Sequence, residues 1–91
     1  MTTYYRQHPG LRLTSVEDEG IVLHLDSRRY FSVNETGLLI LDALRRPQSA
    51  EQLVGVLLER YQVTAEYARD CVARFLTSCQ DSELVVQDDA A

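Results

Sequence analysis

The 91-residue sequence predicts an α+β fold in which a three-stranded antiparallel sheet packs on three helices. Three short segments with strand-like alternation occupy the first third of the chain, and polar turns separate them. Three amphipathic segments follow, each preceded by a residue suited to capping a helix. Hydrophobic residues make up 45% and charged residues 25% of the chain, which is the profile of one globular domain with a modest core.

The sheet is predicted from three segments between residues 11 and 33. Leucines alternate with polar residues at the start of Leu11–Val16, and Ile21–Asp26 places three aliphatic side chains on one face. On the opposite face of that segment, His24 is predicted to be a half-exposed polar residue. The segment Arg29–Val33 alternates in the same way, with Phe31 and Val33 sharing a face. The tight turns between the segments predict an antiparallel meander.

Three helices are predicted from apolar residues at helical spacing and from residues that cap helix N-termini. Asn34 caps the first helix, which Pro47 ends. Ser49 caps the second helix, where Gln52 completes a capping box, and Thr64 caps the third. The third helix has the clearest apolar stripe, made of Ala68, Cys71, Val72, Phe75, Leu76 and Cys79. The second and third helices and the turn between them form a candidate helix-turn-helix, with the strands as wings.

The domain boundaries are predicted near the two ends of the chain. Residues 1–10 are predicted to be a flexible arm, residues 11–87 the folded domain, and residues 88–91 a frayed tail. No apolar run approaches the roughly 20 residues that a membrane span needs, and the first residues lack the apolar core of a signal peptide. A cytoplasmic location without membrane contact is therefore expected.

The charge of the chain disfavours nucleic acid as a partner. The net charge is −5, and the third predicted helix balances Arg69 and Arg74 against Glu66 and Asp70. Binding to a phosphate backbone needs a basic stripe, which this helix lacks. A winged-helix DNA-binding regulator is kept as an alternative from another functional class.

Catalytic and metal chemistry find little support in the sequence. Cys71 and Cys79 are eight residues apart on one predicted helix, about 12 Å along its axis. A disulfide needs Cα atoms within about 7 Å, so these cysteines are predicted to be unbridged. A pairing of Cys71 with His24 as nucleophile and base lacks an activating basic cluster and a Gly-rich oxyanion turn. No enzyme activity, metal or cofactor is expected.

Peptide binding remains as a function that the predicted elements support. The last strand of the meander, Arg29–Val33, is an edge that can pair with an extended peptide through its main chain. The flank of the third helix supplies a second wall if that helix lies beside the edge. Tyr30 and Phe31 fit core positions equally well, with the edge covered, and both interpretations stay open on these residues alone.

The order of these segments resembles the PqqD-like domains that recognise leader peptides, above all the discrete leader-binding proteins of lasso-peptide biosynthesis. The similarity covers Gly20 to Val86 and rests on four stretches, "GIVLHLDSRRYFSVNETG", "LLILDAL", "SAEQLVGVLLERYQV" and "ARDCVARFLTSC". Two positions depart from the family pattern, which often has a glycine after the first helix and another before the last leucine. This chain has Arg46-Pro47 and Glu83-Leu84 at those positions.

The resemblance implies a winged helix-turn-helix-like fold and a role as a RiPP recognition element, a non-catalytic binder of ribosomally made precursor peptides. The leader segment is then expected as an added strand beside the third strand and against the third helix. The resemblance implies leader contacts from Arg29, Tyr30, Phe31, Ser32, Tyr67, Asp70, Cys71, Arg74 and Phe75.

The implied partners are the precursor leader peptide and a transglutaminase-like cysteine leader peptidase to which the leader is delivered. The cyclase of a lasso-peptide pathway is a further partner that the resemblance suggests. A peptide chaperone for a radical modifying enzyme is the alternative role for the same fold.

Overall fold

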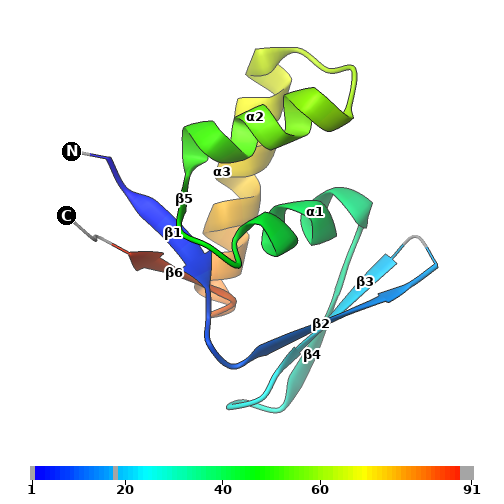
Figure 1. Cartoon of the computed structure of the whole chain (residues 1–91). Coiled ribbons are helices and arrows are strands. Elements are labelled where there is room, and N and C mark those ends of the chain that lie inside the picture. The colour runs from blue at the N-terminus through cyan, green and yellow to red at the C-terminus, as the bar shows by residue number, and fades with distance from the viewer. Residues whose placement is uncertain (1, 18, 89–91) are drawn as a thin grey trace.

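The computed structural model describes residues 2–17 and 19–88. These residues form two small sheets and three helices, and the helices lie grouped together in Figure 1. The predicted α+β class, with an antiparallel three-stranded sheet and three helices, is confirmed. A second sheet is the main addition. In chain order the elements are β1 (Tyr4–Gln7), β2 (Leu11–Val16), β3 (Glu19–His24), β4 (Arg29–Val33), α1 (Glu35–Ala43), β5 (Gln48–Ser49), α2 (Ala50–Arg60), α3 (Ala65–Asp81) and β6 (Val85–Asp88).

The first sheet is the predicted meander, with strand order β2-β3-β4. In its register Val22 pairs with Leu13 on one side and Phe31 on the other, so these three side chains form a row on the face toward the core. Gly20 allows α1 to approach this face closely, because a Cβ atom there would lie 2.8 Å from Leu38 Cδ1. The sheet and α1 are therefore packed directly against each other.

The second sheet, with strand order β5-β1-β6, was not predicted. Its central strand is β1, which lies inside the segment that the sequence predicted to be a flexible arm. Gln7 N–H also donates to the Leu44 carbonyl (2.8 Å) and His8 N–H to the Leu84 carbonyl (2.9 Å). These bonds tie the segment to the ends of α1 and α3. Residue 88 closes β6, and the rest of the predicted tail, residues 89–91, lies outside the described residues.

The three predicted helix caps are all confirmed. The side chain of Asn34 accepts from Gly37 N–H (2.8 Å), and that of Thr64 accepts from Tyr67 N–H (3.1 Å). Ser49 and Gln52 form the reciprocal capping box before α2. Each cap satisfies backbone donors that a helix N-terminus leaves unpaired, so local chemistry sets where these helices begin.

The core lies between the helices and the inner faces of the two sheets. On α3 the predicted stripe is confirmed, although Cys71 and Phe75 at its edge are only half buried. On α2, Val54 is buried and Val56 is half buried. Among the described residues the buried hydrophobic side chains are Leu11, Val22, Ile40, Leu41, Leu44, Leu53, Val54, Leu57, Ala68, Val72, Leu76, Cys79, Leu84 and Val85.

The predicted half-exposed position of His24 is wrong, since only 2% of this residue is exposed. Its ring Nε2–H donates to the carbonyl of Glu83 at 3.1 Å, and its ring lies 4.4 Å from that of His8. The distant carbonyl satisfies the polar atom of His24, so the ring can be buried without an unpaired hydrogen-bonding group. None of the helices formed by the described residues has the length and apolar character that crossing a membrane requires.

Candidate functional site

A groove of about 320 Å³ opens between the first turns of α1 and one flank of α3, where β4 runs into α1. On the α1 side, Asn34 and Thr36 are polar and Ile40 is apolar. On the α3 side, Tyr67 and Phe75 are aromatic and Cys71 contributes a thiol. The groove is lined by Asn34, Thr36, Gly37, Ile40, Tyr67, Cys71, Arg74 and Phe75. Four of the nine predicted site residues are in this set, and all four come from α3.

The close approach of α1 and α3 in the groove depends on a glycine. A Cβ atom at Gly37 would lie 2.8 Å from Phe75 Cε1, which is closer than side-chain atoms tolerate. The same Gly37 donates its N–H to the Asn34 cap, so the first turn of α1 is fixed both by its cap and by the Phe75 ring. Phe75 therefore forms a preorganised part of the groove.

The α3 flank carries an exposed aromatic side chain, a thiol and an ion pair. Tyr67 is 57% exposed, and its hydrogen bond with the Cys71 side chain raises the pKa of Tyr67. Cys71 itself is half buried and unbridged, as predicted. Arg74 pairs with Asp70 one turn away at 2.7 Å, which places Asp70 at the rim of the groove. A bound peptide would thus meet a rim with both signs of charge.

The four predicted strand residues do not line the groove. Phe31 is half buried on the inner face of the sheet, and the Arg29 guanidinium lies 5.5 Å from the centre of its ring. Tyr30 is 73% exposed and pairs with Leu23 on the outer face, and Ser32 is exposed on the same face. These residues can reach a peptide at the groove through their main chain, because β4 pairs with β3 alone among the described strands.

The α1 side of the groove was missed in the sequence. Asn34, Thr36, Gly37 and Ile40 follow β4 without a break, so the first turn of α1 necessarily lies beside the end of the edge strand. That connection was visible in the sequence. The short step from the strand at Val33 to the cap at Asn34 is the signal that could have placed them.

A second feature is the face of the β2-β3-β4 sheet that points away from the core, which we call the outer face and which carries exposed hydrophobic side chains among polar ones. Its exposed hydrophobic side chains are Val16, Ile21, Leu25 and Tyr30. No helix or strand among the described residues covers this face, and in Figure 1 the helices lie on the other side of the sheet. Adjacent exposed apolar side chains on one sheet face are typical of a contact surface for another protein.

A cluster of possible metal ligands lies at the end of β3. One ligand atom from each of His8, His24 and Asp26 lies within 4.8 Å of the others. Gly10 N–H donates to His8 Nδ1 (3.0 Å), so a neutral His8 ring carries its proton on Nε2, the nitrogen that faces Asp26 at 3.8 Å. A metal bound at Nε2 would have to displace that proton and break the bond from Gly10. The hydrogen bonds therefore favour a His–Asp pair over a metal site.

Comparison with known protein families gives one match that covers most of the chain. Residues 19–85 match the family described as coenzyme PQQ synthesis protein D (PqqD). The chain belongs to the PqqD family. The predicted resemblance to PqqD-like domains is therefore confirmed, and the matched region runs from β3 through α3 to the start of β6.

Two solved structures share the fold of this PqqD-family chain. One is described as TbiB1 in complex with the TbiA(beta) leader peptide, with 22% identity, a TM-score of 0.78, and coverage of 94% of this chain and 98% of that chain. The other is described as lasso peptide synthetase B1 complexed with the leader peptide, with 22% identity, a TM-score of 0.76, and coverage of 90% and 96%. No curated protein sequence matches the chain significantly.

Proposed function

We propose that this PqqD-family protein is a non-catalytic cytoplasmic RiPP recognition element that binds the leader segment of a precursor peptide as an added strand on β4. The observation that carries the proposal is the free edge of β4, which ends at the groove between α1 and α3. Both solved structures of the same fold are described as complexes with a leader peptide. Unpaired backbone groups on an edge strand give affinity for any extended peptide, and neighbouring pockets select its side chains.

In this mechanism the two kinds of contact have different roles. The main chain of Arg29–Val33 pairs with the leader and fixes its direction. Phe75 and Ile40 at the base of the groove accept an apolar leader side chain, and Tyr67 covers it from the rim. Because Gly37 already positions Phe75, little ordering of the pocket is required on binding, which favours affinity. The remaining members of the predicted contact set, Tyr30 and Ser32, lie on the outer face and contribute only their backbone.

The direct test is a titration of labelled leader peptide, encoded beside this gene, followed by fluorescence anisotropy. Tyr67→Ala is expected to weaken binding by about 1–2 kcal/mol, a factor of roughly 5 to 30, because it removes an aromatic anchor. Tyr67 is more than half exposed, so circular dichroism should report an unchanged fold. Leu58→Ala, an exposed apolar change on α2 that is outside the groove, is the control. Equal affinity of the Tyr67→Ala and Leu58→Ala variants would contradict the proposed groove.

We further propose that the bound leader is delivered to a transglutaminase-like cysteine leader peptidase through the outer face, with the pathway's cyclase as a further partner. The outer face points away from the core, so a protein docked there leaves the groove accessible. Raising the effective concentration of the leader near the peptidase then accelerates cleavage without catalysis by this chain. Tyr30→Ala should slow peptidase cleavage and leave leader affinity unchanged. A loss of leader affinity in that variant would instead place Tyr30 in the leader site.

One other function has a specific observation in its favour. The matched family is described by its part in coenzyme PQQ synthesis, which suits a peptide chaperone for a radical modifying enzyme. The genes beside this one discriminate between a lasso-type recognition element and a chaperone for a radical enzyme, since a peptidase and an asparagine-synthetase-like cyclase accompany a lasso-type precursor. DNA binding is disfavoured, because Arg69 pairs with Glu51 (3.8 Å) and Arg74 with Asp70, which neutralises the basic residues of α3.

A further inference from the structure

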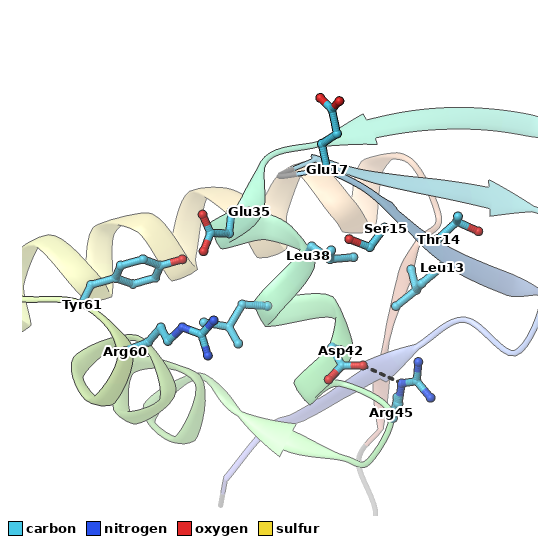
Figure 2. Close-up of a pocket in the computed structure, with 11 residues that line it drawn as sticks. Leu13, Thr14, Ser15, Glu17, Glu35, Leu38, Asp42, Arg45, Arg60 and Tyr61 are labelled. Carbon is cyan, nitrogen blue, oxygen red and sulfur yellow. Dashed lines mark ion pairs between the residues drawn. The ribbon is translucent and has the colours of Figure 1, made fainter.

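We call the groove between α1 and α3, where the leader is proposed to bind, the leader groove. A pocket of about 400 Å³ lies on the side of α1 that faces away from it. Its floor is the face of α1 that carries Leu38 and Leu39, and its walls are β2 on one side and the C-terminal end of α2 on the other (Figure 2). We call it the α1 pocket. Its lining consists of Leu13, Thr14, Ser15, Glu17, Glu35, Leu38, Leu39, Asp42, Arg45, Arg60 and Tyr61.

One polar atom in the α1 pocket is left without a partner. The hydroxyl of Tyr61 is buried and makes no hydrogen bond with any described residue. Its backbone is held in place, because Tyr61 N–H donates to the Leu57 carbonyl at the end of α2. In Figure 2 the hydroxyl end of Tyr61 points into the pocket, toward the side of Glu35. A buried hydroxyl without a partner is unfavourable in the free protein, but the oxygen has almost no accessible surface, so a ligand in the pocket does not contact it.

The α1 pocket contains both paired and unpaired charged side chains. Asp42 and Arg45 pair with each other at 2.8 Å and largely cancel. Glu35 and Glu17 form no ion pair within the part of the chain that the structure describes, and neither does Arg60 at the opposite wall. The pocket therefore offers the carboxylates of Glu35 and Glu17 for a cation, the guanidinium of Arg60 for an acceptor, and leucine side chains for an apolar group.

We propose that the α1 pocket binds a short peptide segment of a partner protein that carries an arginine or lysine next to a branched aliphatic residue. The cationic side chain lies against Glu35 and Glu17, the aliphatic side chain covers Leu38 and Leu39, and a main-chain carbonyl accepts from Arg60. A peptide is the occupant that fits because it supplies a cation, an apolar group and a carbonyl within a few bonds. The overall charge of −5 favours a basic partner as well.

This proposal is independent of the leader groove, which uses the other face of α1. Thr36, Gly37 and Ile40 line the groove, whereas Leu38, Leu39 and Asp42 line the α1 pocket. Leader binding is measured with a different ligand and at different residues. Either proposal can therefore fail while the other stands.

The test uses acetyl-Leu-Arg-amide as the probe and the methyl resonances of Leu13, Leu38 and Leu39 as the readout in NMR titrations of the full chain. Saturable shifts of these methyl groups, with a dissociation constant in the millimolar range, are expected. Acetyl-Leu-citrulline-amide is the matched neutral probe and should bind at least threefold more weakly. Equal binding of the two probes, or shifts confined to the leader groove, would overturn the proposal.

Two variants separate a binding role from a structural one. Glu35→Gln should weaken the arginine probe twofold to fivefold and leave the citrulline probe unchanged, whereas Glu59→Gln, an exposed change on α2 outside the pocket, should alter neither. Tyr61→Phe should raise the urea midpoint of the free protein, because it removes an unpaired buried hydroxyl, and should leave the affinity for the arginine probe unchanged. Unchanged affinity of the Glu35→Gln variant for the arginine probe would contradict the assignment. Methyl shifts that depend on protein concentration alone would mean that a second copy fills the pocket, which also overturns it.

Discussion

Glu83 has a left-handed backbone conformation, with φ at 60°, although it is not a glycine. It directly follows the C-cap of α3, where helices commonly end on a glycine in this conformation. The family pattern often has a glycine at this point, and the backbone angle now gives the physical reason for that preference. By contrast, none of the described residues around Arg46 and Pro47 has a positive φ, so the other departure from the family pattern carries no such strain.

Glu83→Gly is therefore expected to stabilise the fold by about 0.5–1 kcal/mol, because glycine adopts this conformation without the clash of a Cβ atom. The carbonyl that accepts from His24 belongs to the backbone and remains in place. Urea denaturation followed by circular dichroism measures the change. Glu83→Ala is the matched control, since it removes the carboxylate and keeps the Cβ atom. If both variants are equally stable, backbone strain at residue 83 is not the cause.

The two cysteines should differ strongly in reactivity. Burial raises the pKa of the Cys79 thiol to about 12, and this side chain is part of the core. Cys71 is half buried in the leader groove. Iodoacetamide at pH 8 is expected to modify Cys71 alone in the native protein, and bound leader peptide should slow that reaction about tenfold or more. Mass spectrometry of the digested chain checks both sites. Unchanged alkylation of Cys71 in the presence of saturating leader would contradict the groove.

At the scale of elements, the glycines inside α1 and α2 have opposite effects on the fold. A Cβ atom at Gly55 in α2 would meet nothing within 4 Å, whereas one at Gly37 in α1 would strike Phe75. Gly55 therefore lowers the stability of its helix without a packing reason within the chain, and Gly37 is required by the contact between α1 and α3. Their difference is invisible in the sequence, because both glycines lie inside amphipathic segments.

Gly55→Ala should stabilise the protein by about 0.5–1 kcal/mol, because alanine has the higher helix propensity and the site has room for the methyl group. Gly37→Ala should destabilise the protein and weaken leader binding, since Phe75 must move. Thermal denaturation of both variants tests the contrast, with the leader titration as the second readout. A Gly37→Ala variant as stable as the parent would show that the Phe75 ring shifts at no cost.

At the scale of the whole molecule, β1 pairs with β5 and β6 and is hydrogen-bonded through Gln7 to the C-terminal end of α1. It is the central strand of its sheet, and Tyr5 within it packs against the core. Removal of residues 2–7 is expected to destabilise the fold by about 2–4 kcal/mol through lost hydrogen bonds and lost burial. Removal of Thr2 and Thr3 alone, which are exposed and precede β1, is the control and should change little. A true flexible arm would make the two truncations equivalent.

The parts of the fold that the sequence predicted correctly are those decided by neighbouring residues. The caps Asn34, Ser49 and Thr64 act on backbone groups three residues away, so their function is readable locally. The parts that were missed depend on distant partners. The strand β1 forms only because β5 and β6 flank it, and His24 is buried only because the carbonyl of residue 83 lies opposite it.

The candidate site also divides into a part set by neighbouring residues and a part set by distant contacts. Four residues of α3 that the family resemblance implied, Tyr67, Cys71, Arg74 and Phe75, line one side of the groove, and their contact with a leader stays a prediction. The α1 wall and the α1 pocket required knowledge of how α1 is oriented between the sheet and α3. No periodicity within nine residues carries that information, because it is set by contacts such as those of Gly20 with Leu38 and Gly37 with Phe75.

The pairing of the first strand with the last has a consequence for how this domain can be combined with other proteins. Tyr4 and Asp88 are direct cross-strand partners, so the chain enters and leaves the domain within a few ångströms at a single edge. A domain of this kind can be inserted into a surface loop of another protein without stretching its host. The same fold is thereby equally suited to a separate subunit and to an internal segment of a larger chain.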